Sequence, residues 1–213
     1  MIDTEDEARR WLAGLAGVDA TAIARLEQLV ALLTEENGRQ NLVAAVSLAE
    51  VWRRHIVDSA QLLLDVPRET GGPWLDLGTG AGFPGLVVAV LRPDMEVVLV
   101  ESRTRRVEWL QRVVHTLGLA RVRVDGRRLE WVESFAAAVI SARAFAPLEK
   151  LLELSARFST PTTLWRLPKG RSAQQELSQI DGWSHAFHVK QSLTDPDAGI
   201  IVGQALQQAR RKR

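Results

Sequence analysis

Asp76-Leu77-Gly78-Thr79-Gly80-Ala81-Gly82-Phe83-Pro84-Gly85 is the stretch that decides the fold. It follows a short apolar run, Trp74–Leu77, and opens a helical run, Gly85–Leu91. A glycine-rich turn between a strand and a helix is typical of doubly wound α/β sheets, where ligands bind beyond the carboxyl ends of the strands. We therefore expect a ligand-binding loop at this point of the chain.

The composition of this loop indicates the kind of ligand. It lacks the Gly-Lys-Ser/Thr ending of a phosphate-binding loop, and Phe83 stands where the dinucleotide fingerprint has its last glycine. A carboxylate just before the loop, at Asp76, would repel a pyrophosphate. These features favour S-adenosylmethionine, a cationic ligand without phosphate. The residues expected to hold it are Asp76, Gly78, Thr79, Gly80, Gly82 and Phe83.

Short apolar runs alternate with helical runs along the rest of the chain. The strands that we predict are Trp74–Leu77, Val97–Glu101, Val122–Val124, Ala137–Ser141, Thr162–Leu167, Ala186–Leu193 and Ile200–Leu206. Alternation of strand and helix predicts a mainly parallel sheet covered on both faces, and the last two strands are expected to be antiparallel. The prediction is therefore an α/β fold with a mostly parallel seven-stranded sheet.

The first third of the chain predicts helices. Ala8–Leu15 and Ala22–Glu36 have the helical period, and Asn37-Gly38 is expected to end the second helix. Ser47 and Glu50 form a capping-box pattern for a third helix. We expect an N-terminal helical extension over residues 1–70 and the main domain over 71–213, joined in one compact unit.

Composition excludes several classes of protein. The 213 residues are 46% apolar, enough for one domain with a core, and they contain no cysteine for disulfides or thiolate sites. No apolar run approaches the roughly 20 residues that span a membrane. The acidic start, Met1–Glu7, is unlike a secretory signal, so we expect a cytoplasmic protein without membrane contact. Four histidines show no metal-ligand spacing, and no metal is expected.

Positive charge is concentrated although the net charge is only +1. Eight arginines lie between Arg103 and Arg128, and the chain ends in the basic run Ala209–Arg213. Such a stripe indicates either a local contact with a polyanion or a solvated helix face followed by a frayed tail.

Two further segments are candidates for the ligand site. Glu101, followed by Ser102, ends the second predicted strand, where an acidic side chain can accept both ribose hydroxyls. The alternative for Glu101 is a cap on the next helix; we favour the ribose. The turn Arg128-Leu129-Glu130 follows the third strand and either covers an adenine or is an ordinary turn.

At these residues the chain resembles a known family, the bacterial 16S ribosomal RNA guanine-N7 methyltransferases, also called the glucose-inhibited division protein B family. The similarity runs from about Asn41 to Gly170, and the loop ending Phe83-Pro84-Gly85 is its most specific element. The other matching segments are Asn41-Leu42, Arg54–Ser59, Arg128–Glu130, Ser141–Ala144 and Lys169-Gly170. The family usually has aspartate where this chain has Glu101.

The resemblance implies a class I, Rossmann-like fold that uses S-adenosylmethionine. It also implies methyl transfer to N7 of a guanine in the decoding-region loop of 16S rRNA, presented on small-subunit particles or precursors. We expect a monomer. The competing hypotheses are a methyltransferase acting on a small molecule, which needs no arginine stripe, and an RNA-binding assembly factor without catalysis.

The same resemblance suggests which residues position the substrate. Arg143, after the fourth strand, is expected to hold the target nucleotide and to border the cofactor, with Lys169 second; for both, a salt bridge at the sheet edge is the alternative. No general base is expected, because guanine N7 carries no proton. His55 is expected to brace the glycine loop or contact RNA. The arginines expected to bind RNA phosphates are Arg103, Arg105 and Arg106.

Overall fold

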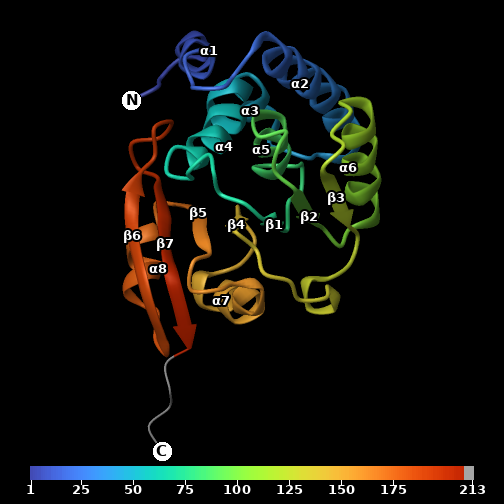
Figure 1. Cartoon of the computed structure of the whole chain (residues 1–213). Helices are drawn as coiled ribbons and strands as arrows, with labels where there is room; N and C mark the ends of the chain where they lie inside the picture. Colours follow the sequence, from blue (N-terminus) through green and yellow to red (C-terminus); the bar gives the residue numbers. More distant parts are fainter. Residues whose placement is uncertain (209–213) are drawn as a thin grey trace, which may run out of the picture.

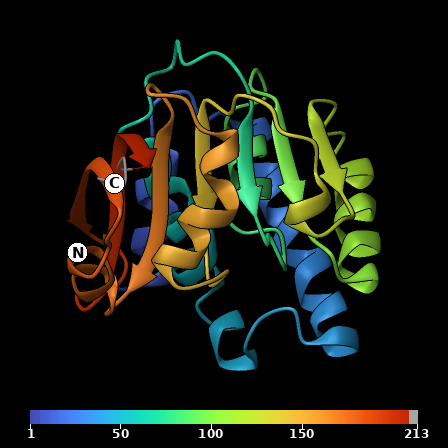
Figure 2. The same ribbon diagram turned by 90° about the horizontal axis from the view of Figure 1, so that it is seen from below.

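A single seven-stranded sheet organises the molecule. The computed structural model describes residues 1–208, and the basic run 209–213 lies outside them (Figure 1). The strands are β1 (Trp74–Leu77), β2 (Val97–Val100), β3 (Val122–Asp125), β4 (Val139–Ala142), β5 (Leu164–Gly170), β6 (Trp183–Gln191) and β7 (Gly199–Gln208). Their order is β3-β2-β1-β4-β5-β7-β6, seen face-on in Figure 2. The first five are parallel and β7 is antiparallel to both neighbours, which confirms the predicted α/β fold.

Helices cover both faces of this sheet, as predicted (Figures 1 and 2). The α-helices are α1 (Glu5–Ala13), α2 (Ala20–Gln40), α3 (Ala45–Leu48), α4 (Asp58–Ala60), α5 (Gly85–Leu91), α6 (Thr104–Thr116), α7 (Leu148–Ser155) and α8 (Ala173–Ser178). The helical turns are η1 (Trp52–Val57), η2 (Gln61–Leu63), η3 (Leu129–Trp131) and η4 (Ala156–Phe158). The sequence did not predict α7 and α8.

The alternation of side chains along β1 divides the core in two. Trp74 packs in the cluster shared with α1, α2, α5 and α6, whereas Leu75 and Leu77 pack in the cluster shared with α7. Successive side chains of a strand point to opposite faces, so four consecutive buried residues require cover on both sides. Asp76 accordingly faces the same layer as Trp74, beneath α5.

Two predictions for the N-terminal helices are wrong. Asn37-Gly38 does not end α2, which continues to Gln40 and ends at Asn41 in a left-handed conformation. The Asn37 side chain is buried and accepts the Val43 N–H at 2.8 Å, so it holds the segment that follows the helix. Ser47 does not cap a helix through Glu50; it lies inside α3, and its hydroxyl contacts the His55 ring.

The helical extension shares its core with the main domain. Leu26, Leu29 and Leu33 of α2 belong to the same apolar cluster as Leu86 of α5 and Leu110 of α6. The boundary at residue 70 remains a prediction. No helix within residues 1–208 combines the length and apolar character needed to cross a membrane.

Candidate functional site

Two cavities lie beyond the carboxyl ends of the parallel strands. The smaller, here the glycine cleft, has about 200 Å³ and is lined by Gly78, Glu101, Ser102, Arg103, Arg106, Arg127, Arg128 and Leu129. The larger, here the Arg143 pocket, has about 730 Å³ and is lined by side chains that include Arg54, Asp58, Arg143 and Lys169. Ala144 and Phe145 line both. The two cavities therefore flank the point between β1 and β4 where the chain changes direction along the sheet, the expected ligand position in such folds.

Asp76 supports the glycine loop from beneath. Its carboxylate is fully buried, accepts the Ser141 hydroxyl at 2.6 Å and the Gly85 N–H at 3.0 Å, and also accepts the Thr79 hydroxyl. A side chain at position 85 could not fit, because its Cβ would come within 2.9 Å of Asp76 Oδ2. Burial raises the pKa of Asp76 to about 6 despite these donors. Direct contact of Asp76 with a ligand remains a prediction.

Several backbone N–H groups of the loop already donate hydrogen bonds within the protein. Val100 O accepts the Thr79 N–H at 3.1 Å, Thr79 O accepts the Gly82 N–H at 2.8 Å, and Glu101 accepts the Gly80 N–H at 3.1 Å. A phosphate-binding loop needs free N–H groups that point at the anion. This loop consequently offers few free N–H groups to a pyrophosphate.

Glu101 lies at the rim of the glycine cleft, where the sequence placed it. One carboxylate oxygen accepts the N–H groups of Ser102 and Arg103 at 2.8 and 2.9 Å, and the other accepts Gly80. Arg106 is 3.9 Å away. Glu101 thus bonds to the segment just before α6 and to the loop, and does not cap the helix itself, which lacks a side-chain cap. Its ribose contact stays a prediction.

The turn after β3 closes the other side of the cleft. Arg128 and the buried Leu129 line it, whereas Glu130 is exposed and does not. Trp131 at the end of η3 is 68% exposed, an unusual position for a side chain of that size.

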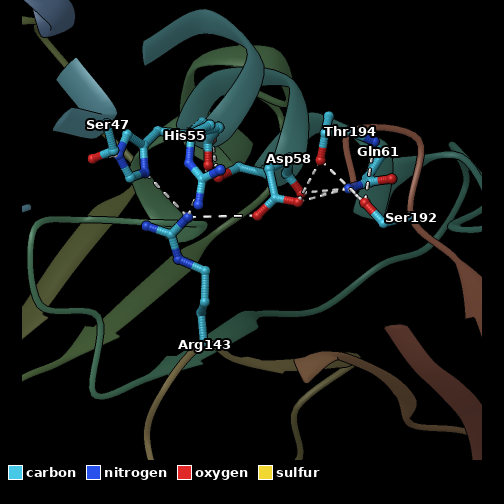
Figure 3. Close-up of polar contacts among 9 residues, drawn as sticks. Ser47, His55, Asp58, Gln61, Arg143, Ser192 and Thr194 are labelled. Atoms are coloured by element: carbon cyan, nitrogen blue, oxygen red, sulfur yellow. Dashed lines mark hydrogen bonds and ion pairs between the residues drawn. The ribbon is translucent and has the colours of Figure 1, made fainter. Parts of the chain in front are cut away.

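Arg143 extends into the larger pocket and joins two elements far apart in sequence (Figure 3). Its guanidinium lies 3.3 Å from His55 Nδ1, 3.5 Å from Asp58 Oδ2 and 5.2 Å from the centre of the Phe83 ring. Burial lowers the pKa of Arg143, and the carboxylates of Asp58 and Asp76 act in the opposite direction. A long ion pair, one of the expected alternatives, is therefore present.

His55 braces the glycine loop, one of its two predicted roles. Its ring stacks on Phe83 at a centroid distance of 5.1 Å, and its Nε2 lies 2.8 Å from the Ser47 hydroxyl. The side chain comes from η1, a π-helical turn, a form that is frequent at functional sites. Burial, with Arg143 and Arg54, lowers the pKa of His55 to about 3, so the ring is neutral at pH 7. The Phe83 side chain, although it belongs to the loop, is itself buried.

Lys169 lines the same pocket but its ammonium is occupied. It donates to Ala146 O at 2.6 Å and pairs with Glu176 at 2.9 Å. Both contacts hold the segment after β4 against β5 and α8.

The arginine stripe separates into paired and unpaired members. Arg112 pairs with Glu36, and Arg123 and Arg127 pair with Asp125. Among residues 1–208, Arg103 and Arg105 form no ion pair, and both lie at the N-terminal end of α6. That end already carries partial positive charge, so these two cations do not stabilise the helix through its dipole. Their contact with RNA phosphates stays a prediction.

Sequence reasoning gave no role to two residues of the site. Phe145 lies over Gly78, where a Cβ would approach its ring to 2.4 Å, and it separates the two cavities. Asp58 stands opposite Arg143. The segment Arg54–Ser59 had signalled Asp58, but no pattern pointed to Phe145. The described chain contains no cluster of His, Asp and Glu suited to a metal ion.

Comparisons with known proteins agree with this arrangement. Residues 22–194 match the model of the GidB family, rRNA small subunit methyltransferase G. The chain is 61% identical over 206 residues to the ribosomal RNA small subunit methyltransferase G of Novosphingobium aromaticivorans, covering 95% of this chain and 89% of that protein.

Solved structures share the fold at low identity. A putative O-methyltransferase from Klebsiella pneumoniae has a TM-score of 0.62 at 15% identity, covering 92% of this chain and 95% of its own. MtNAS in complex with S-adenosylmethionine has a TM-score of 0.55 at 17% identity, and the match covers 95% of this chain and 84% of that one. The Rossmann-like methyltransferase fold is thereby confirmed, and the match over most of its length shows that this chain belongs to the GidB family of rRNA small subunit methyltransferases.

Proposed function

We propose that this protein transfers a methyl group from S-adenosylmethionine to N7 of a guanine in 16S rRNA. The observation that supports this best is the pair of cavities that meet at Ala144 and Phe145, one suited to a nucleoside and one to an acceptor. A donor molecule in the first and a target base in the second would be separated only by that wall.

The residues of the glycine cleft fit the cofactor. Glu101 offers a carboxylate for the ribose hydroxyls, and Leu129 offers an apolar surface for the adenine. The occupied loop N–H groups disfavour dinucleotides. When bound, S-adenosylmethionine supplies an electrophilic methyl group on a positively charged sulfur.

The reaction asks the protein for position rather than for a proton acceptor. Guanine N7 has an in-plane lone pair and no proton, so no residue needs to act as a base. His55, with a pKa of about 3, is a weak base and is occupied by Ser47 and Phe83. Orienting two bound reactants can contribute roughly 7–11 kcal/mol. Arg143 would restrain the target nucleotide or its phosphate; Lys169, expected in the same role, is engaged by Ala146 and Glu176 and would have to release one of them first.

RNA would approach across the N-terminal end of α6. Arg103 and Arg106 line the cleft, and Arg105 lies between them in sequence. The exposed ring of Trp131, next to Arg128, can stack on an unpaired base. We infer a cytoplasmic monomer that acts on the small ribosomal subunit or a precursor.

Labelled S-adenosylmethionine and small subunits from cells that lack this enzyme provide the test. We expect label in 16S rRNA and chain cleavage at one 7-methylguanine. A parallel reaction with fully modified subunits should incorporate none. Label on a metabolite would favour a small-molecule methyltransferase, and RNA binding without label would favour an assembly factor.

A further inference from the structure

Asp58 presents a fixed carboxylate to the Arg143 pocket. Its Oδ1 accepts the side-chain amide of Gln61 at 2.9 Å and the hydroxyl of Thr194 at 3.0 Å (Figure 3). Ser192 ties these two partners together, since its hydroxyl lies 3.2 Å from Gln61 Nε2 and 3.1 Å from Thr194 Oγ1. A network from α4, η2 and the segment between β6 and β7 thus sets the orientation of one side chain.

The second oxygen of this carboxylate is left largely free. Oδ2 lies 3.5 Å from Nη1 of Arg143, at the outer limit of a hydrogen bond, and no other side chain within residues 1–208 bonds to it. The Asp58 side chain is 21% exposed, and the residue lines the pocket. One oxygen of this half-buried carboxylate accepts hydrogen bonds from the protein, and the other is available to accept hydrogen bonds from a ligand.

We propose that Asp58 recognises the target base by accepting hydrogen bonds from N1–H and N2–H of guanine; this rests on the proposed function. Extruded bases are commonly read on their Watson–Crick edge. Guanine alone among the four RNA bases has two adjacent donors on that edge, and a carboxylate accepts from both. Adenine offers a lone pair at N1, which the carboxylate repels.

The chemistry of the transfer strengthens this contact. The lone pair of N7 forms the bond to the methyl carbon while the carbon–sulfur bond breaks and its electron pair stays on sulfur. No proton leaves, so the purine becomes positively charged and its N1–H and N2–H groups become better donors. The carboxylate of Asp58 therefore interacts more strongly with the transition state than with the ground state, which raises kcat.

The pocket has the space and the surroundings for this pose. A cavity of about 730 Å³ is in the range of small-molecule sites. Its wall at Ala144 and Phe145 is shared with the glycine cleft, so a base whose Watson–Crick edge faces Asp58 can turn its opposite, N7-bearing edge toward that wall.

Small subunits reconstituted with guanosine or inosine at the target position test this assignment. Inosine keeps N7 and N1–H but lacks the 2-amino group. For the unaltered protein we expect kcat/KM to be about 10- to 100-fold higher for guanosine, the worth of one hydrogen bond to a charged group. In Asp58→Asn this ratio should fall toward one, and kcat for guanosine should fall about 100-fold with little change in KM. Asp195→Asn alters another carboxylate that lines the pocket and should leave the ratio unchanged.

Equal losses for guanosine and inosine in Asp58→Asn would overturn the inference, because they would mean that Asp58 only positions Arg143. Affinity for S-adenosylhomocysteine reports whether each variant is folded. If Asp58→Asn does not fold, Thr194→Val loosens the same carboxylate and should give an intermediate ratio; an unchanged ratio there would also contradict the proposal. Absence of any N7 product with the unaltered protein would refute the proposed function itself, and the inference with it.

Discussion

The glycine cleft and the Arg143 pocket lie side by side but are built in different ways. In the cleft, loop N–H groups and carboxylates are already bonded to one another, as Gly80 and Glu101 are. In the pocket, Arg143 and Asp58 face each other at 3.5 Å, and both can still form hydrogen bonds to a ligand. The first region is thus rigid before any ligand arrives, while the second is prepared to bond to a ligand. Substitutions in the two regions should consequently fail in different ways.

The largest effect is expected from Asp76→Ala. It would leave the Ser141 hydroxyl, the Thr79 hydroxyl and the Gly85 N–H without their buried acceptor, at a cost of about 3 kcal/mol in the free energy of unfolding. Urea unfolding and calorimetry with S-adenosylhomocysteine measure both consequences. Asp76→Asn keeps an acceptor for Gly85 and should lose less. If Asp76→Ala bound S-adenosylhomocysteine normally, the cleft would not depend on this carboxylate.

His55 should make stability depend on pH. Its folded pKa of about 3 lies below the unfolded value of 6.5, so the unfolded chain takes up the proton first and stability is lost as pH falls below 6.5. From pH 7 to pH 5 this group removes about 2 kcal/mol. The buried Asp76 has a raised pKa, so its protonation between pH 6 and 4 stabilises the folded protein, opposite to the effect of His55. A His55 variant retains Asp76, so this contribution cancels when the variant is compared with the unaltered protein.

Urea unfolding of His55→Asn at the two pH values isolates this contribution. The variant should lose less stability on acidification than the unaltered protein, by about that amount. His115→Asn, at an exposed position on α6, is the matched control and should follow the unaltered protein. Identical pH dependence in His55→Asn and the unaltered protein would contradict a buried neutral ring.

Glu101 tests whether the cleft reads a ribose. Glu101→Gln removes the charge and should raise the Kd for S-adenosylhomocysteine about 10-fold, equal to about 1.4 kcal/mol. Glu101→Asp retains the carboxylate and should bind closer to the unaltered protein. Calorimetry measures both, and unfolding curves account for the altered hydrogen bonds to Ser102 and Arg103. Equal affinities for all three proteins would leave Glu101 with only its structural role, bonding to Gly80 and to the segment before α6.

The smallest effect is expected at the N-terminal end of α6. Replacing Arg103 and Arg105 with alanine should weaken RNA binding and reduce the slope of log affinity against log salt by about 0.7–0.9 for each lost phosphate contact. Alanine at Arg112 and Arg123 removes the same charge from arginines that are already paired, and should change the slope less. Filter binding across a salt series measures this, and equal slopes for the two double variants would argue against the proposed RNA path.

Much of the fold could be predicted because buried parallel strands are recognisable in the sequence as short runs of apolar residues. All seven strands were predicted near their observed positions, the apolar runs Trp74–Leu77 and Val97–Glu101 most plainly, and the turn Asp76–Gly85 located the switch in direction. The short helices α7 and α8 were missed, since eight and six residues give little periodicity. The capping box at Ser47 misled because its hydroxyl is used by His55, a tertiary contact that spacing cannot reveal.

The site was predictable only in part. Gly78, Glu101, Ser102, Arg128 and Leu129 line the cleft where the sequence placed them. Whether a side chain faces a cavity or supports it from below depends on packing, which is why Asp76 and Phe83 proved to be buried. The meeting of Asp58 with Arg143 joins positions 85 residues apart, and no local pattern encodes it.

The shared wall at Phe145 has a thermodynamic consequence. Because Phe145 lines both cavities, a ligand that shifts its ring on entering one cavity changes the free energy of filling the other. Linkage then requires reciprocity: whatever factor a molecule over Gly78 imposes on the affinity for RNA, RNA must impose on that molecule. One aromatic side chain can in this way set the order in which two reactants assemble.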